Sequence, residues 1–433
     1  MKKEIMFRVF LSVFLLLRIT AAAQDLNKNQ QTKLFNWLNT IPDLEVKIIE
    51  SDSIFTEAYE IMIIQPLDHK NPEKKIFQQR LFLSHINEEK PVIFDTEGYS
   101  AKHRTLELSR LLNANQLIVE HRYFGESVPD SIDWQFMNIK QAASDHHRIV
   151  SLFKEFYAGK WISTGISKGG QTAMYHRKFF PDDVDATLTY VAPLNYSDRD
   201  ERVYEFIDNV STPECRKKVE EFQNLVLQNK SDLLPLFKSH SDSSNLTYKI
   251  GLEAAFEYVV LEYSFAYWQW SDGNCELILT STSTTEEVFN HLRINSPFKY
   301  ISDKEIEQLK PFFYQAFTEI GYYDYEIEGF SDLIKNVDGS NKIFLSIEEE
   351  IKFDPSVMQD VNDWIQNEGN NFIFIYGEFD PWSATSVELS GKTNSIKIIH
   401  PNGSHRTRIK HLSDNNRGLI FTKLEEWLDL KLD

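Results

Sequence analysis

A strand, a glycine-rich turn and a helix follow one another closely in the first half of the chain. Residues 161–164 form a short β-prone run, and residues 171–179 have helical composition. The sequence Gly165-Ile166-Ser167-Lys168-Gly169-Gly170 lies between them and fits the pattern G-x-S-x-G. A turn of this kind exposes the serine hydroxyl at the carboxyl edge of a sheet, and its glycines avoid side-chain clashes. The segment predicts an α/β sheet with Ser167 as a nucleophile at its edge.

Strand and helix patterns alternate around this turn, and we interpret them as βα units. They lie at residues 91–94, 116–120, 139–157 and 186–191. Ahead of them, residues 55–65 and 77–83 are β-rich runs separated by a turn-rich segment, which predicts an antiparallel hairpin. Strands that alternate with helices imply a mostly parallel sheet covered on both faces.

The N-terminal segment has the pattern of a secretory signal peptide. Lys2 and Lys3 precede an apolar run at residues 9–17, and three alanines end at Ala23. The apolar run is too short to cross a bilayer, which takes about 20 residues. We therefore expect cleavage after Ala23, a secreted or periplasmic location, and no membrane span in the mature chain.

Charge and cysteine content narrow the function further. The formal net charge of −19 opposes binding to a phosphate backbone, so nucleic acid is not an expected partner. The two cysteines, Cys215 and Cys275, are candidates for one disulfide in an oxidising compartment, with two free thiols as the alternative. His and Cys residues lack the spacing of a zinc site, so we expect neither a metal nor another cofactor.

A nucleophilic serine needs an acid and a base, which follow it in the order Ser, Asp or Glu, His in one large class of hydrolases. Residues 371–376 form an apolar strand run, and Glu378 and Asp380 come directly after it. We select Asp380 as the acid, because the turn before Pro381 brings it towards the sheet edge.

The base is expected after the last strand. His405 follows the strand run at residues 395–399 at loop distance. His400 at the end of that strand and His411 further on are the competing histidines. We select His405, which completes a Ser167-Asp380-His405 triad.

Two backbone amides should bind the oxyanion that forms when the serine attacks a carbonyl. One is the amide of Lys168, directly after the nucleophile. The other should come from the loop after residues 91–94, where Gly98 lets the backbone approach closely. Whether Glu97, Gly98 or Tyr99 donates is left open by the sequence.

The order of these elements predicts an α/β-hydrolase core with a large helical cap inserted between nucleophile and acid. From about residue 198 helical patterns dominate, most clearly at residues 217–228 and 252–270, and a closing helix is expected at residues 417–430. The expected segments are a signal peptide (1–23), the first part of the core (24–197), the cap (198–355) and the second part of the core (356–433).

Four motifs together resemble the secreted bacterial tripeptidyl aminopeptidase family, α/β-hydrolase serine peptidases related to the lysosomal Pro-Xaa carboxypeptidases and dipeptidyl peptidases. They are residues 120–127 (EHRYFGES), 165–170 (GISKGG), 376–383 (YGEFDPWS) and 403–405 (GSH). The resemblance runs from about residue 55 to the C-terminus. Carried over by matched motif, it implies that Ser167 is the nucleophile, Asp380 the acid and His405 the base.

The resemblance also implies the removal of short peptides, tripeptides in particular, from the free N-terminus of peptide substrates. Such an enzyme needs a carboxylate to hold the substrate ammonium. Glu97 is the first candidate, and Glu205 and Glu262 are its rivals. Two other functions stay open on the same scaffold: an esterase or lipase with the same triad, and a secreted binding protein without catalysis.

Overall fold

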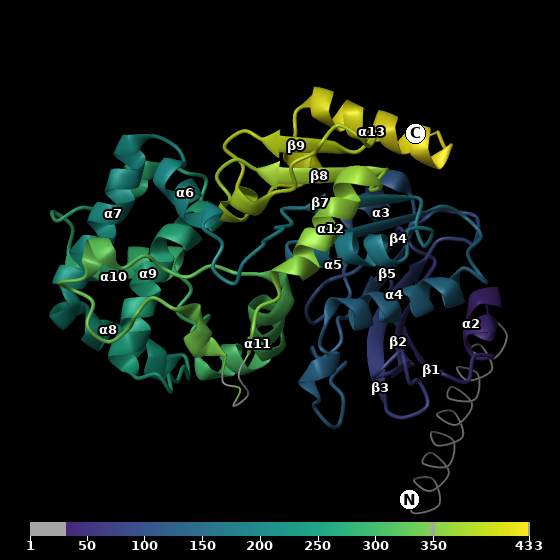
Figure 1. The fold of residues 1–433 in the computed structure, drawn as a ribbon, viewed down its shortest axis with the longest axis horizontal. Coiled ribbons are helices and arrows are strands. Elements are labelled where there is room, and N and C mark those ends of the chain that lie inside the picture. Colours follow the sequence, from purple (N-terminus) through teal and green to yellow (C-terminus); the bar gives the residue numbers. More distant parts are fainter. Residues whose placement is uncertain (1–31, 346, 348–350, 432–433) are drawn as a thin grey trace, which may run out of the picture.

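The computed structural model describes residues 32–345, 347 and 351–431, and these residues build a nine-stranded sheet with helices around it (Figure 1). The signal peptide predicted for residues 1–23 lies outside the described residues. The strands are β1 (Leu44–Ile49), β2 (Glu57–Pro66), β3 (Ile76–His85), β4 (Val92–Asp95), β5 (Asn115–Val119), β6 (Trp161–Ile166), β7 (Ala186–Tyr190), β8 (Phe372–Gly377) and β9 (Ile396–His400).

The sheet is mostly parallel, as the sequence predicts. Its spatial order is β1-β2-β3-β5-β4-β6-β7-β8-β9, and all pairs from β5 to β9 are parallel. The first four strands in that order pair antiparallel. The predicted hairpin is β2 and β3, which pair from Glu57 opposite His85 to Pro66 opposite Ile76. Strand β1 was not predicted, because its half-exposed residues include charged side chains and give a weak β pattern.

Helices cover both faces of the sheet. One face carries α3 (Glu107–Leu112) and α13 (Asp414–Leu428), whose leucines share a buried cluster with Ile373 and Ile375 of β8. The other face carries α4 (Ile139–Phe153), α5 (Lys168–Phe179) and α12 (Pro355–Asn367), and there the alternate β8 residues Phe372 and Phe374 are buried. Successive residues of a strand point to opposite faces, so a sheet covered on both sides needs apolar residues at every position. A short helix α2 (Lys33–Leu38) packs beside this layer.

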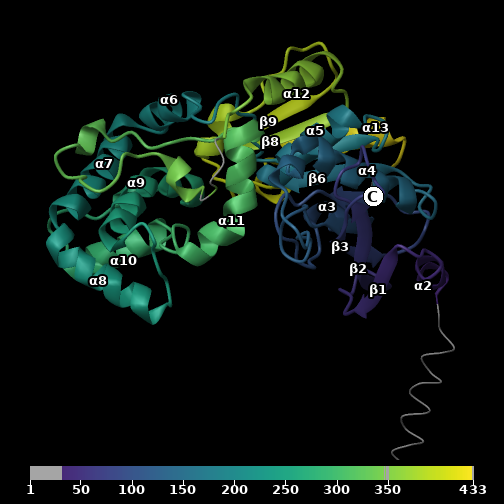
Figure 2. The ribbon, with the colours of Figure 1, turned by 60° about the horizontal axis from the view of Figure 1, so that its bottom comes forward.

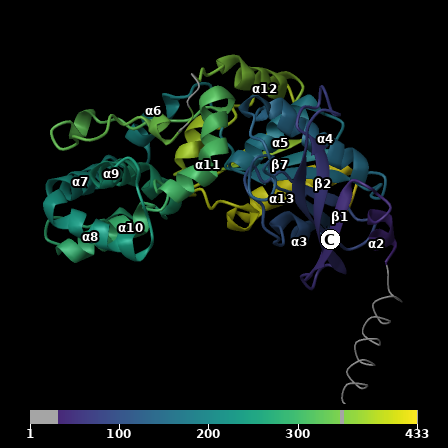
Figure 3. The same ribbon diagram turned by 90° about the horizontal axis from the view of Figure 1, so that it is seen from below.

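The long connection from β7 to β8 is helical and forms a group to one side of the sheet (Figures 1 and 3). Its helices are α6 (Arg202–Asn209), α7 (Pro213–Gln228), α8 (Lys230–Ser243), α9 (Leu252–Trp270), α10 (Thr285–Asn295) and α11 (Asp303–Gln315). Helix α9 runs through the middle and is buried along most of its length, which explains why its sequence is apolar on most faces. Helix α11 lies on the side of the group that faces the sheet (Figure 2).

A disulfide braces this helical group. It joins Cys215 at the start of α7 to Cys275 in the segment after α9, with the two Cα atoms 5.5 Å apart. The cross-link therefore holds the N-terminal end of α7 to the segment that follows the C-terminal end of α9. No helix in the described part of the chain is long and apolar enough to cross a membrane.

Candidate active site

The turn between β6 and α5 holds Ser167 in a strained backbone conformation. Its φ and ψ are 54° and −123°, a combination that side-chain-bearing residues rarely adopt. The turn closes because glycines lie around it. A Cβ on Gly165 would lie 2.2 Å from the backbone of Gly169, and one on Gly170 would lie 2.5 Å from Cβ of Ala192. The glycines of the motif are thus required by the close approach of strand and helix.

Asp380 and His405 lie next to each other although 24 residues separate them in the chain. Asp380 follows β8 and His405 follows β9, and because these strands are parallel neighbours their carboxyl ends meet. The distance from Asp380 Oδ2 to His405 Nδ1 is 2.7 Å, and both side chains are buried. An aspartate at Nδ1 holds the imidazole so that Nε2 faces a proton donor.

Ser167 and His405 line one cavity of 940 Å³ between the sheet edge and the helical group. Of the competing residues, Glu378 is exposed and accepts a hydrogen bond from the amide of Asn402. His411 accepts one from the amide of Arg408, and neither it nor His400 belongs to the lining of this cavity. The geometry therefore favours Asp380 and His405 as the pair beside Ser167.

The loop after β4 packs against the first turn of α5. A Cβ on Gly169 would lie 2.6 Å from the carbonyl oxygen of Glu97, and Thr96 Oγ1 donates a 2.8 Å hydrogen bond to the carbonyl of Gly169. Gly98 has a φ of +85° and leaves no room for a side chain. Lys168 is the first residue of α5, so its amide has no partner within the helix. Both predicted sources of oxyanion donors are therefore adjacent.

The three carboxylates proposed for substrate binding differ in their surroundings. Glu97 lines the cavity, but its carboxylate lies 2.5 Å from Arg104, which also pairs with the buried Asp95. Glu205 is exposed on α6 and is not in the lining, which argues against its predicted role. Glu262 of α9 lines the cavity and is buried, and Tyr323 and Tyr325 donate hydrogen bonds of 2.9 and 2.6 Å to its Oε2.

Glu262 was predicted only as a rival of Glu97, and its carboxyl group is buried. Burial raises the pKa of its carboxyl group to about 7, and the two tyrosine hydroxyls oppose that rise. A glutamate within a mostly apolar helix was the available signal, because a buried charge is costly and is kept where it has a partner or a ligand. Glu253 and Glu257 of α9 give the same signal, and Lys230 pairs with both of them. The tyrosine partners of Glu262 are about sixty residues away in the chain.

Aromatic rings form much of the cavity wall. Trp270, at the end of α9, meets the ring of His405 edge-on at 5.2 Å. Phe265 and Tyr323 stack at 4.1 Å and, with Trp382, surround the region near Glu262. These rings suit apolar parts of a ligand between Ser167 and Glu262.

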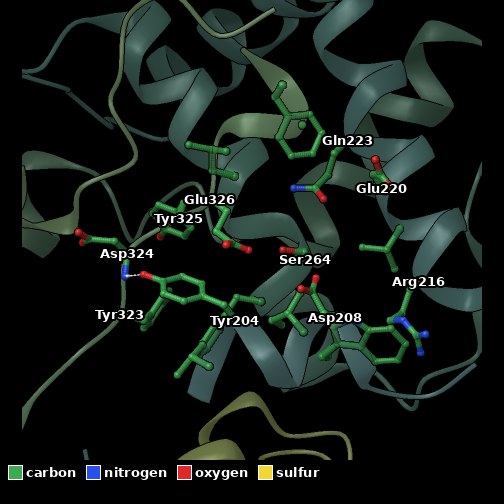
Figure 4. Close-up of a pocket in the computed structure, with 18 of the residues that line it drawn as sticks. Tyr204, Asp208, Arg216, Glu220, Gln223, Ser264, Tyr323, Asp324, Tyr325 and Glu326 are labelled. Carbon is green, nitrogen blue, oxygen red and sulfur yellow. Dashed lines mark hydrogen bonds between the residues drawn. The ribbon is translucent and has the colours of Figure 1, made fainter. Parts of the chain in front are cut away.

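A second cavity of 430 Å³ lies within the helical group (Figure 4). It is lined from α6, α7, α9 and residues 323–330, and Asp208, Ser264 and Glu326 point towards its centre. Ser167, Asp380 and His405 are not in its lining, whereas Phe265 and Tyr323 line both cavities. The stacked pair therefore forms part of the wall between them, and the larger cavity is the candidate active site.

Comparison with known proteins agrees with this geometry. The model of the PS-10 peptidase S37 family matches residues 31–431. The chain belongs to this family of peptidases. It is also 30% identical over 394 residues to a prolyl tri/tetrapeptidyl aminopeptidase of Streptomyces mobaraensis. The aligned region covers 88% of this chain and 82% of the relative. The prediction of a serine peptidase of the tripeptidyl aminopeptidase type is confirmed at this level.

Two of the solved structures that match this chain are only weakly similar to it. The proline iminopeptidase of Mycobacterium smegmatis matches with a TM-score of 0.43 and 12% identity, over 85% of this chain and 98% of the other. The 2-hydroxy-6-oxo-6-phenylhexa-2,4-dienoate hydrolase of Rhodococcus sp. strain RHA1 matches with a TM-score of 0.37 and 12% identity, over 89% and 100%. The S37 chain has the α/β-hydrolase fold, as its own sheet order indicates.

Gly98→Ala should disturb the site, because its Cβ would lie 2.6 Å from the amide nitrogen of Gly169 at a positive φ. We expect a loss of about 1–3 kcal/mol in the free energy of unfolding and slower labelling of Ser167 by a fluorophosphonate. Gly329→Ala is the matched control, since its Cβ meets nothing within 4 Å and its φ is not positive. Equal unfolding midpoints and labelling rates for both variants would contradict the tight packing of this loop.

Proposed function

We propose that this protein is a serine exopeptidase that releases tripeptides from the free N-terminus of oligopeptides. The observation that supports this best is one cavity with Ser167 and His405 at the sheet edge and the buried Glu262 on the helical group. A nucleophile and a carboxylate without a cationic partner among the described residues, in one aromatic-walled cavity, suit a substrate with a free ammonium group.

Ser167, His405 and Asp380 act as a triad in this proposal. Ser167 Oγ attacks the scissile carbonyl while His405 Nε2 takes its proton, and Asp380 stabilises the imidazolium. The oxyanion is bound by backbone amides at the start of α5 and in the loop after β4. His405 then protonates the leaving amine, and water hydrolyses the acyl-enzyme.

The spacing along α9 supports release of three residues. Trp270, which contacts His405, lies about two turns and 12 Å beyond Glu262 along the helix axis. Three residues of extended peptide span about 10 Å. A substrate whose ammonium reaches Glu262 therefore presents its third peptide bond near the triad. The relative's name, prolyl tri/tetrapeptidyl aminopeptidase, agrees with a product of this length.

The helical group acts as a cap in this proposal, with residues 198–355 as its bounds. It supplies Glu262 and the rings of Phe265 and Tyr323, which stand behind the carboxylate and separate the two cavities. A wall at this place stops a longer peptide from passing beyond Glu262. The cap thus limits the enzyme to chain ends and sets the length of the product.

We also propose that residues 1–23 direct export. The basic start, the apolar run and the alanines before Gln24 support this, and the Cys215–Cys275 disulfide suits an oxidising compartment. The exported protein should begin at Gln24 when its N-terminus is sequenced. A mature protein that keeps Met1 would contradict export by cleavage.

The released products provide the main test. Incubation with an unblocked oligopeptide should yield tripeptides by mass spectrometry, and Ser167→Ala should reduce kcat at least about 10⁴-fold. An N-acetylated peptide should be a poor substrate, because it has no ammonium for Glu262. Hydrolysis of a short-chain p-nitrophenyl ester without any peptidase activity would favour an esterase instead. Fluorophosphonate labelling that persists in Ser167→Ala would contradict the nucleophile.

The pKa of Glu262 makes peptide binding depend on pH. Its pKa is raised to about 7, so the carboxyl is neutral below that pH and charged above it, while the substrate amine loses its charge above about pH 8. The ratio of kcat/KM between wild type and Glu262→Gln should therefore peak between about pH 7 and 8, at about 10- to 100-fold, and decrease on both sides.

Glu305→Gln is the control for this measurement. Glu305 also lines the cavity but forms an ion pair with Lys299, at 2.6 Å. Its kcat/KM ratio to wild type should stay flat over the same pH range. A flat ratio for Glu262→Gln as well would argue against Glu262 as the ammonium ligand.

A further inference from the structure

The side chain of Lys168, the residue that follows Ser167, is buried. Only 2% of the residue is exposed, and no carboxylate among the described residues forms an ion pair with it. Burial lowers its pKa well below the ordinary value for lysine. A lysine is rarely buried without an acidic partner, since desolvation of its amine is costly. The buried amine of Lys168 therefore needs a hydrogen-bond acceptor close to Ser167.

This acceptor lies in the loop after β4. Nζ of Lys168 donates to the carbonyl oxygen of Gly98 at 2.7 Å. Otherwise Nζ lies over the rings of Tyr99 and Phe124, at 5.5 and 5.3 Å from their centroids, and these two rings meet edge-on. The surroundings are thus aromatic, and the Gly98 carbonyl is the polar group that fixes the amine.

The same hydrogen bond sets the direction of the next amide. In a trans peptide the N–H points opposite to the C=O, so holding the Gly98 carbonyl towards Lys168 turns the N–H of Tyr99 the other way. The Tyr99 carbonyl accepts a hydrogen bond from the amide of His121, at 3.0 Å. The Tyr99 N–H has no acceptor among the described residues, and Tyr99 lines the cavity that holds Ser167.

The backbone amide of Lys168 lies on the helix side of the contact between α5 and the loop after β4. It is at the free N-terminal end of α5, where helix amides lack partners. Because Gly98 and Gly169 have no side chains, the loop and the helix can approach each other closely. The amide and the side chain of Lys168 therefore both lie at the contact between α5 and the loop after β4.

We propose that Lys168 is a positioning residue of the oxyanion site, whose buried amine holds the Gly98 carbonyl so that the Tyr99 amide becomes the second donor beside the Lys168 amide. This rests on the proposed serine peptidase mechanism. Without the amine, the Gly98–Tyr99 peptide is free to rotate and can turn its carbonyl towards the oxyanion. The transition state then loses a donor, while the ground-state contacts of the substrate with Glu262 and the aromatic wall remain.

Lys168→Met tests this proposal, because methionine fills similar space and donates no hydrogen bond. We expect kcat to fall about 100-fold, the size of effect seen when one oxyanion donor is removed, with KM within about twofold of wild type. The affinity of a tripeptide aldehyde, which forms a tetrahedral adduct with Ser167, should fall by a similar factor. A non-reactive tripeptide product should inhibit as it does wild type.

Phe124→Leu is the matched control. It removes aromatic packing from Nζ of Lys168 but leaves the hydrogen bond to Gly98, and Phe124 is not in the cavity lining. Its kcat should stay close to that of wild type. The proposal would be overturned if Lys168→Met kept the kcat and the aldehyde affinity of wild type. It would also be overturned if both variants lost kcat equally, or if Lys168→Met changed only KM.

Lys168→Gln serves if the methionine variant does not fold. Its amide ends one atom short of the lysine amine and so cannot reach the Gly98 carbonyl at hydrogen-bond distance. A decrease in kcat of at least about tenfold at unchanged KM would support the proposal, and an unchanged kcat would overturn it.

Failure of the underlying mechanism has a different outcome. If wild-type protein cleaves no unblocked peptide and Ser167 is not labelled by a fluorophosphonate, the proposed function itself is wrong. If wild type is active and labelled, the Lys168 variants report on the positioning role alone.

Discussion

The close contact between strand β6, helix α5 and the loop after β4 is the constraint on which the rest of this site depends. It forces Ser167 into a positive φ and requires glycine at Gly165, Gly169 and Gly98. Such strain persists only where the surrounding structure over-determines it. Here the parallel sheet supplies that rigidity, because β6 has a strand on each side and helices cover both faces.

The parallel arrangement also explains how distant residues meet. Strands β6, β8 and β9 end at one edge, so the residues that follow them, Ser167, Asp380 and His405, gather there. The chain leaves this edge after β7, forms the helical group and returns at β8. An insertion at that point shares a cavity with Ser167. It adds Glu262 to the cavity without disturbing the sheet, which is how one hydrolase core accommodates different substrates.

Much of the fold was readable from local patterns. Helix α9 spans the predicted residues 252–270, and the hairpin, the parallel strands and the interruption by helices all follow the apolar periodicity. Among the shorter elements, β1, α2 and the six-residue helix α3 were missed. Each is short or half-exposed, so the burial that stabilises it leaves little periodic trace in the sequence.

By itself the sequence determined the turn that holds Ser167, the order of Asp380 and His405 after it, and the helical insertion, since all are expressed in neighbouring residues or in chain order. Only the tertiary structure distinguished the surroundings of the three candidate carboxylates. It pairs Glu97 with Arg104, leaves Glu205 outside the cavity and surrounds Glu262 with tyrosines. It also shows that the side chain of Lys168, for which the sequence predicted no role beside that of its amide, is a buried contact of the Gly98 carbonyl. Burial and pairing across tens of residues depend on how the layers pack, and local patterns do not encode those distances.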